Sequence, residues 1–151
     1  MKSQHVSGIT VALGVINIFI STYFGAFTPL LYLTLIAMFC DLITRCYAAA
    51  VSEEEKIESK KIIQGLWRKL GLILLIIMTV LLDVGLKMLA ELLDIHITVN
   101  IIFTGFTLGW ILIRELISNL ENLKSGGIEL PCFVEKALSI VEEKIESWER
   151  K

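Results

Sequence analysis

Four long apolar stretches occupy most of this 151-residue chain. They run over residues 6–27, 30–51, 70–92 and 97–118. Each has roughly the 20 residues that a helix needs to cross a hydrocarbon core about 30 Å thick. Backbone N–H and C=O groups find no water inside lipid, so each crossing segment should be a helix. The pattern therefore predicts an all-α, polytopic membrane protein with four transmembrane helices.

Basic residues gather outside these stretches. Of the 14 Lys and Arg residues, 11 lie in the N-terminal tail, the middle segment or the C-terminal tail. Cytoplasmic segments of membrane proteins are enriched in Lys and Arg, so we expect both termini and the middle segment in the cytoplasm. The predicted units are a four-helix transmembrane domain at 1–124, with a cytoplasmic loop at 52–69, and a cytoplasmic amphipathic tail at 125–151.

Local motifs mark the ends of the predicted elements. Thr28-Pro29 predicts a tight hairpin between the first two spans, because proline disfavours helix in the residue before it. Ser52 and Glu55 have the spacing of a capping box, which predicts a short polar helix ending near Gly65. The loop then ends in an aromatic residue beside two cations, which is typical of an anchor at the membrane interface: Trp67, Arg68 and Lys69.

The C-terminal tail carries apolar residues at heptad spacing, which predicts an amphipathic helix: Val134, Leu138, Val141, Ile145 and Trp148. Only about two heptads are present, which is short for a coiled coil. Packing on the loop or membrane surface and self-association both remain open. The excess of Glu in this tail argues against strong binding to anionic lipid.

Ionisable residues inside membrane spans are costly and suggest a functional role. The second span carries Asp41 and Arg45, and the third carries Asp83 and Lys87, both at i,i+4 spacing. Each pair can neutralise itself on one helical face, and both aspartates fall near the predicted midplane. The two pairs could form a polar stripe that joins two helices of one subunit. They could instead line subunit contacts or a water-filled lesion, or serve proton-coupled transport.

The fourth span contains Gly105-x-x-x-Gly109, a spacing that allows two membrane helices to approach closely. We therefore expect a homo-oligomer with these glycines at a helix contact. A contact within one subunit remains the alternative.

Signals for catalysis are missing from the sequence. There is no Gly-rich phosphate loop, no nucleophile elbow and no zinc-protease motif, and His5 and His96 fall on opposite predicted sides of the membrane. Hydrophobic residues make up 55% of the chain, with a mean hydropathy of +0.72, which disfavours soluble enzymes and nucleic-acid binders. We predict no enzyme, no cofactor, no metal site and no nucleic-acid partner.

Several short pieces occur in a fixed order along the chain: Asp41-x-x-Thr44, Ser59-x5-Gly65-x-x-Arg68-Lys69, Asp83, Glu115-x-x-Ser118-x-x-Glu121-Asn122, and Gly127-Ile128-Glu129-Leu130-Pro131. On these residues the chain resembles the phage holin family that includes the toxin-secretion holins of clostridia. The resemblance covers about residues 33–140. One departure is Arg45, at a position where that family usually has glycine.

The resemblance implies a pore- or lesion-forming protein of the bacterial cytoplasmic membrane that oligomerises to release an endolysin or to assist toxin export. It implies membrane lipid and further copies of the chain as partners, an antiholin as a candidate partner, and endolysin or toxin as exported cargo. Two alternatives stay open: an antiholin on the same scaffold, and a small four-helix proton-coupled transporter.

Overall fold

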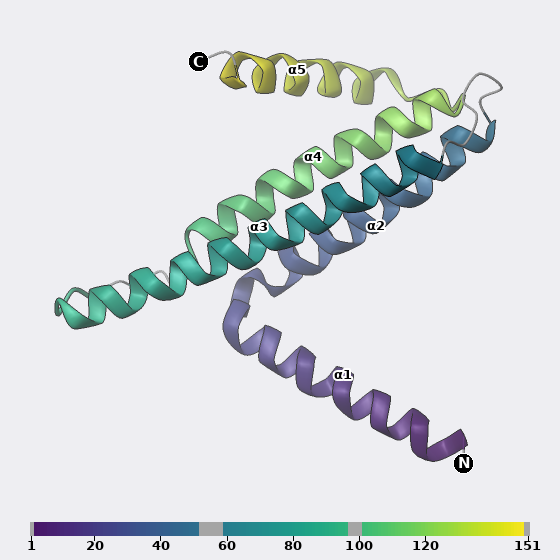
Figure 1. Ribbon diagram of the computed structural model, residues 1–151. Coiled ribbons are helices and arrows are strands. Elements are labelled where there is room, and N and C mark those ends of the chain that lie inside the picture. The colour runs from purple at the N-terminus through teal and green to yellow at the C-terminus, as the bar shows by residue number, and fades with distance from the viewer. Residues whose placement is uncertain (1, 52–58, 97–100, 150–151) are drawn as a thin grey trace.

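The computed structural model describes residues 2–51, 59–96 and 101–149 (Figure 1). The elements are α1 (Lys2–Phe24), the 3-10 helix η1 (Gly25–Phe27), α2 (Thr28–Val51), α3 (Ser59–Leu92), α4 (Phe103–Ser125) and α5 (Cys132–Glu149). No strand occurs in these described ranges. The prediction of an all-α protein is confirmed.

A bundle of three helices, α2, α3 and α4, forms the body of the molecule (Figure 1). The most extensive contact joins α2 to α4, and α3 packs against α4. One face of α2 packs against α4. On this face, the hydroxyl of Thr34 donates hydrogen bonds to the carbonyls of Leu30 and Leu108. The buried apolar core lies between the three helices: Leu31, Met38, Ile76, Leu108 and Ile111.

Helix α1 leaves this bundle instead of packing along it (Figure 1). Gly25 has a φ of 50°, a left-handed conformation that glycine adopts without steric cost, and it redirects the chain before α2 begins. The connection is short, as Thr28-Pro29 predicts, but the expected hairpin of adjacent helices is wrong because α1 and α2 diverge at this turn.

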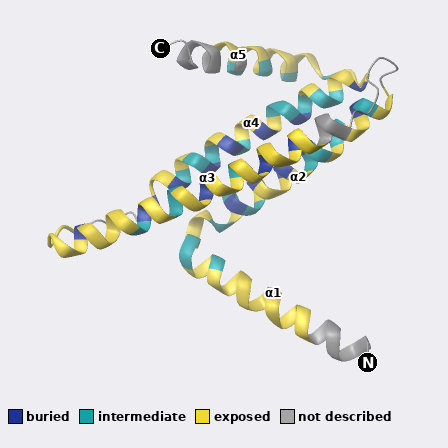
Figure 2. Ribbon diagram, viewed as in Figure 1, coloured by how far each residue is buried: buried dark blue, intermediate teal, exposed yellow. Residues whose placement is uncertain are grey.

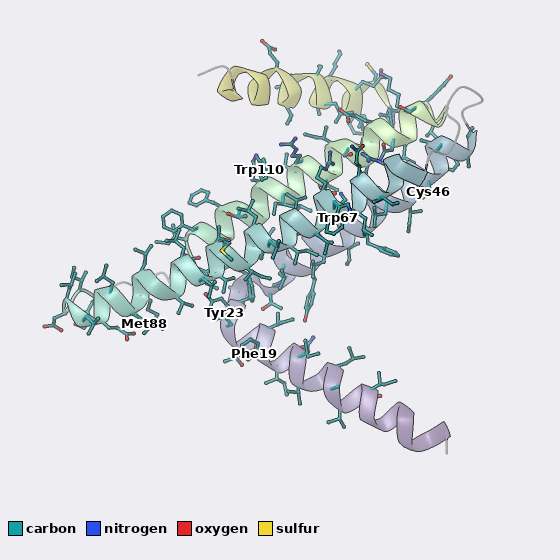
Figure 3. All side chains as sticks on the ribbon, in the orientation of Figure 1. Phe19, Tyr23, Cys46, Trp67, Met88 and Trp110 are labelled. Carbon is teal, nitrogen blue, oxygen red and sulfur yellow. The ribbon has the colours of Figure 1, made fainter. Side chains whose placement is uncertain are left out.

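The contacts of α1 with the bundle lie near its C-terminal end. Ile20 and Phe24 pack against the core, and the hydroxyl of Tyr23 donates a hydrogen bond to the carbonyl of Val80 at 3.2 Å. Figure 3 shows Tyr23 at this junction and Phe19 one turn further out on α1. Most apolar side chains before this junction are exposed, and Phe19 is 74% exposed (Figure 2).

Two continuous helical stretches are long and apolar enough to cross a membrane, Gly8–Val51 and Ile63–Leu92. The first is interrupted in direction at Gly25 and contains both α1 and α2. In the region of the predicted fourth span at 97–118, α4 begins at Phe103 and ends at Ser125, and it is not among the stretches apolar enough to cross a membrane; residues 97–100 lie outside the described residues. Helix α4 differs from the two longer apolar stretches because it contains Arg114, Glu115 and a polar C-terminal half.

The start of α3 differs from the sequence prediction, and α4 ends at a glycine turn. Residues 59–69, assigned to a loop, are the first turns of α3, and the helix continues through Gly65 because one glycine weakens a helix without ending it. The capping box at Ser52 lies outside the described residues. Helix α4 ends before two glycines: Gly127 has a φ of 82°, and the Ile128 N–H donates to the Leu123 carbonyl at 3.1 Å.

Candidate functional site

A buried polar cluster lies where α2, α3 and α4 meet. We use this name for six residues: Asp41 and Thr44 of α2, Lys69 of α3, and Glu115, Asn119 and Asn122 of α4. Residues three and four apart share one face of a helix, so these positions continue the faces that carry the apolar core. The cluster is therefore part of the helix contacts rather than part of the outer surface.

The charged centre of the cluster is one lysine between two carboxylates. The Lys69 Nζ lies 2.7 Å from the Asp41 Oδ2 and also forms an ion pair with the Glu115 Oε2. Lys69 is 5% exposed, and Asp41 and Glu115 are each 1% exposed. Buried charges persist when they are paired and hydrogen-bonded, so this centre ties three helices together through a single ammonium group.

Two asparagine side chains extend the cluster along α4. The Asn122 Nδ2 donates to the Asp41 Oδ1 and to the Thr44 Oγ1, both at 3.1 Å. The Thr44 hydroxyl donates to the Asn119 Oδ1 at 3.1 Å, and the Asn119 Nδ2 donates to the Ala37 carbonyl at 3.0 Å. These side-chain amides bridge α2 to α4 and fix the position of α2 along α4.

One carboxylate oxygen of the cluster has no partner in the structure. The Glu115 Oε1 is buried and makes no hydrogen bond, whereas the Oε2 of the same group meets Lys69. Two carboxylates and one ammonium also leave a formal charge of −1. Among the described residues, no group of three His, Cys, Asp or Glu side chains could hold a metal ion. The arrangement is suited to holding helices together and contains no nucleophile with an adjacent base.

A third buried carboxylate, Asp83 of α3, caps the start of α4. The Asp83 Oδ1 accepts hydrogen bonds from the N–H groups of Ile102 and Phe103 at 3.3 and 3.0 Å, and the Oδ2 accepts one from Thr104 at 2.8 Å. The first N–H groups of a helix lack partners within the helix and carry a partial positive charge. Asp83 supplies both an acceptor and a negative charge from a neighbouring helix.

The closest partners of the two aspartates come from neighbouring helices and not from the predicted i,i+4 positions. Asp41 forms its ion pair with Lys69 instead of Arg45, and Asp83 caps α4 instead of binding the exposed Lys87. The burial of Lys69 also contradicts its predicted role as an interfacial anchor. Periodicity along one helix identifies local partners, but these carboxylates are satisfied by groups from neighbouring helices.

The two aspartates do not lie at one depth. Asp41 lies beside Lys69, and Lys69 and Asp83 are separated on α3 by 83 − 69 = 14 residues. At 1.5 Å per residue this separation is roughly 21 Å, most of the thickness of a hydrocarbon core. The described residues therefore form two separate polar sites along the bundle rather than one continuous stripe.

The two glycines of the Gly-x-x-x-Gly motif have different surroundings. A Cβ added at Gly105 would lie 2.9 Å from the Phe27 Cε1, so Gly105 makes a close contact inside the chain. A Cβ added at Gly109 would meet nothing within 4 Å. Within the described residues, Gly109 is thus open to a neighbour and Gly105 is not.

The remaining predicted residues lie on the outer surface of the molecule or in α5. Trp67 is 68% exposed on α3, beside the exposed Arg68. The Arg114 guanidinium lies 5.3 Å from the ring centroid of Trp110, and Figure 3 shows Trp67 on α3 and Trp110 on α4. In α5, the predicted residues Val134, Leu138 and Val141 are half-buried, whereas the side chains of Ile145 and Trp148 lie outside those described.

The sequence prediction missed the role of Glu115 and of the amides on α4. The sequence analysis gives Glu115 only as part of a motif, and in the structure it is among the most buried side chains. The signal was the repetition of Leu108, Ile111, Glu115 and Asn122 at spacings of three, four and seven, which continues an apolar face into polar residues. The cluster joins residues from three of the sequence pieces that carry the family resemblance.

Comparison with known proteins agrees with that resemblance. The family model described as the bacteriophage holin family matches residues 18–143. No curated protein and no solved structure gives a match. The matched range includes all of α2, α3 and α4, and with them every residue of the buried polar cluster. This chain belongs to the bacteriophage holin family.

Proposed function

We propose that this protein is a holin that oligomerises in the bacterial cytoplasmic membrane and opens lesions, releasing an endolysin or assisting toxin export. The observation that carries the proposal is the contrast between the interior and the outer surface. Lys69 is paired with Asp41 and Glu115 inside the bundle, while the apolar side chains of α1 between Ile9 and Phe19 are exposed. Lipid can cover such a helix in a dispersed subunit, and neighbouring subunits can cover it in an assembly.

Four membrane crossings fit the proposal. The stretch Gly8–Val51 has 44 residues, about twice the length of one crossing, and it changes direction at Gly25. The stretch Ile63–Leu92 supplies a third crossing and α4 a fourth. The buried polar residues of α4 face α2 and α3, whereas its exposed face carries apolar residues such as Phe106 and Ile113, so the lower hydropathy of α4 is compatible with a membrane position.

We expect both termini in the cytoplasm, and a cysteine at Ser125 tests this topology. Ser125 is exposed at the end of α4. In a background with Cys40, Cys46 and Cys132 replaced by serine, a membrane-impermeant maleimide should label Ser125→Cys only after the cells are permeabilised. Strong labelling in intact cells would contradict the topology. A cysteine at Asp94, exposed in the turn after α3 and expected on the outer side in this topology, is the matched control and should label from outside.

Induced expression in bacterial cells tests the lesion itself. A holin should accumulate without effect and then abruptly collapse the membrane potential, as reported by a potential-sensitive dye, and co-expressed endolysin should then lyse the cells. A transporter would change the potential gradually or leave it unchanged. Delay of lysis by a second, known holin when both are expressed would indicate an antiholin and contradict the proposal.

Leucine substitutions at the two glycines separate assembly from folding. Gly109→Leu should abolish crosslinked multimers while the monomer stays inserted, because only a neighbouring subunit can approach this open position. Gly105→Leu should instead destabilise the monomer, because the new side chain meets the ring of Phe27. Membrane fractions crosslinked and resolved on gels provide the measurement.

Persistence of multimers in Gly109→Leu would contradict a subunit contact at this glycine. Helix α5 would then be the better candidate for joining subunits. Truncation after Gly127 removes α5 at the left-handed residue that follows α4, and it leaves the three-helix bundle complete.

A further inference from the structure

Two arginines converge on the outer side of the buried polar cluster. Arg45 of α2 reaches across to α3, where a Cβ added at Gly65 would lie 3.2 Å from the Arg45 Nη1. Arg68 follows Gly65 by three residues, so it lies on a neighbouring position of the same helix surface. Both guanidinium groups are near enough to Lys69 for their charges to act on its ammonium.

This surface carries a positive excess. Three cations, Arg45, Arg68 and Lys69, meet two carboxylates, Asp41 and Glu115, which gives a formal charge of 3 − 2 = +1. Among the described residues, Lys69 forms the ion pairs with both carboxylates; the charge of Arg45 acts on Asp41 without an ion-pair contact, and no ion pair joins Arg68 to an acidic side chain. Two adjacent guanidinium groups repel each other unless an anion lies between them.

The position along the helices indicates where that anion comes from. Gly65 is two residues inside the start of the apolar stretch Ile63–Leu92, and Arg45 is six residues before the end of Gly8–Val51. Both therefore lie at the same membrane boundary. Exposed Trp67 is beside them, and exposed Leu66 and Leu70 continue along α3 toward the membrane interior. A phospholipid, with its phosphate followed by acyl chains, matches this order of basic, aromatic and apolar side chains.

We propose that Arg45, which lies against Gly65, and Arg68, one turn further along α3, form a binding site for the phosphate group of an anionic phospholipid. Arginine suits this role because its planar fork of N–H donors matches phosphate oxygens. Glycine at position 65 leaves room for the Arg45 guanidinium against the α3 backbone. The binding site itself stands on these contacts; only its assignment to the cytoplasmic leaflet rests on the proposed function and topology.

Native mass spectrometry of the full-length protein in detergent tests the site, with phosphatidylglycerol and phosphatidylcholine as probes. Wild-type protein should retain phosphatidylglycerol in preference to phosphatidylcholine. One basic residue near a membrane surface contributes about 1 kcal/mol, so Arg68→Gln should weaken the preference about fivefold and Arg45→Gln/Arg68→Gln roughly 25-fold. Because Arg68 is exposed, the single variant should fold normally.

The matched control is Lys87→Gln/Arg114→Gln, which removes the same charge from exposed positions elsewhere and should keep the preference. Gly65→Leu keeps both arginines but fills the space beside the Arg45 guanidinium, so it should also lose the preference.

Equal losses in the control and the arginine variants would overturn the proposal, as would no preference in the wild type. Displacement of the lipid by millimolar inorganic phosphate would show a site for free anions and overturn the lipid assignment. Lipid retention is measured without lysis, so failure here and failure of lesion formation are distinguished.

Discussion

Lys69→Met should be among the most damaging single substitutions in the bundle. It leaves Asp41 and Glu115 as two buried carboxylates without a cation, and removing one partner of a buried ion pair typically costs about 3–5 kcal/mol. We expect little protein in the membrane fraction and a large decrease in the unfolding temperature of what can be purified in detergent.

Two variants make this prediction specific to the cluster. Arg68→Met removes the adjacent, exposed cation and should leave abundance close to wild type. The triple variant Asp41→Asn/Lys69→Met/Glu115→Gln replaces every charge with a neutral group and should recover much of the lost stability, because a buried ion triad can often be exchanged for uncharged residues. Wild-type abundance of Lys69→Met would show that the cluster does not stabilise the fold.

Asp83→Ala should destabilise the first turn of α4. The N–H groups of Ile102, Phe103 and Thr104 lose their acceptor, and an unsatisfied buried donor costs about 1–3 kcal/mol. Faster hydrogen exchange at these amides is the direct measurement. Asp83→Asn keeps one acceptor oxygen without the charge and should fall between the wild type and Asp83→Ala.

Lys87→Ala is the control that separates the cap from the ion pair predicted by the sequence. A pair between Asp83 and Lys87 would make the two alanine variants similarly unstable. A cap predicts that Lys87→Ala changes stability by less than about 0.5 kcal/mol, as expected of an exposed residue. Equal destabilisation by Lys87→Ala and Asp83→Ala would contradict the cap.

The sequence predicts the helical class of this protein because long apolar runs have few alternatives in lipid. It also predicts the short connection between the first two helices, which Thr28-Pro29 marks. These features depend on short segments, and each can be recognised without knowledge of the other helices.

The polar sites could not be predicted in the same way because their partners are distant in sequence. Asp41 and Lys69 are 28 residues apart, and Lys69 and Glu115 are 46 residues apart. The sequence beside Lys69 also contains Trp67 and Arg68, which resemble an interfacial anchor. The orientation of α3 about its own axis turns Lys69 into the bundle and leaves these two neighbours exposed. Likewise, the direction of α1 depends on one dihedral angle at Gly25.

The separation of α1 from the bundle has an evolutionary consequence. The family match begins at residue 18, close to Ile20, where α1 first packs against the core. Before that point, the described apolar side chains face outward, so selection can act on their overall hydrophobicity while individual residues drift. Related chains should therefore keep an apolar helix here but share few identities within it, whereas substitutions in the three-helix bundle must be compatible with several helices at once.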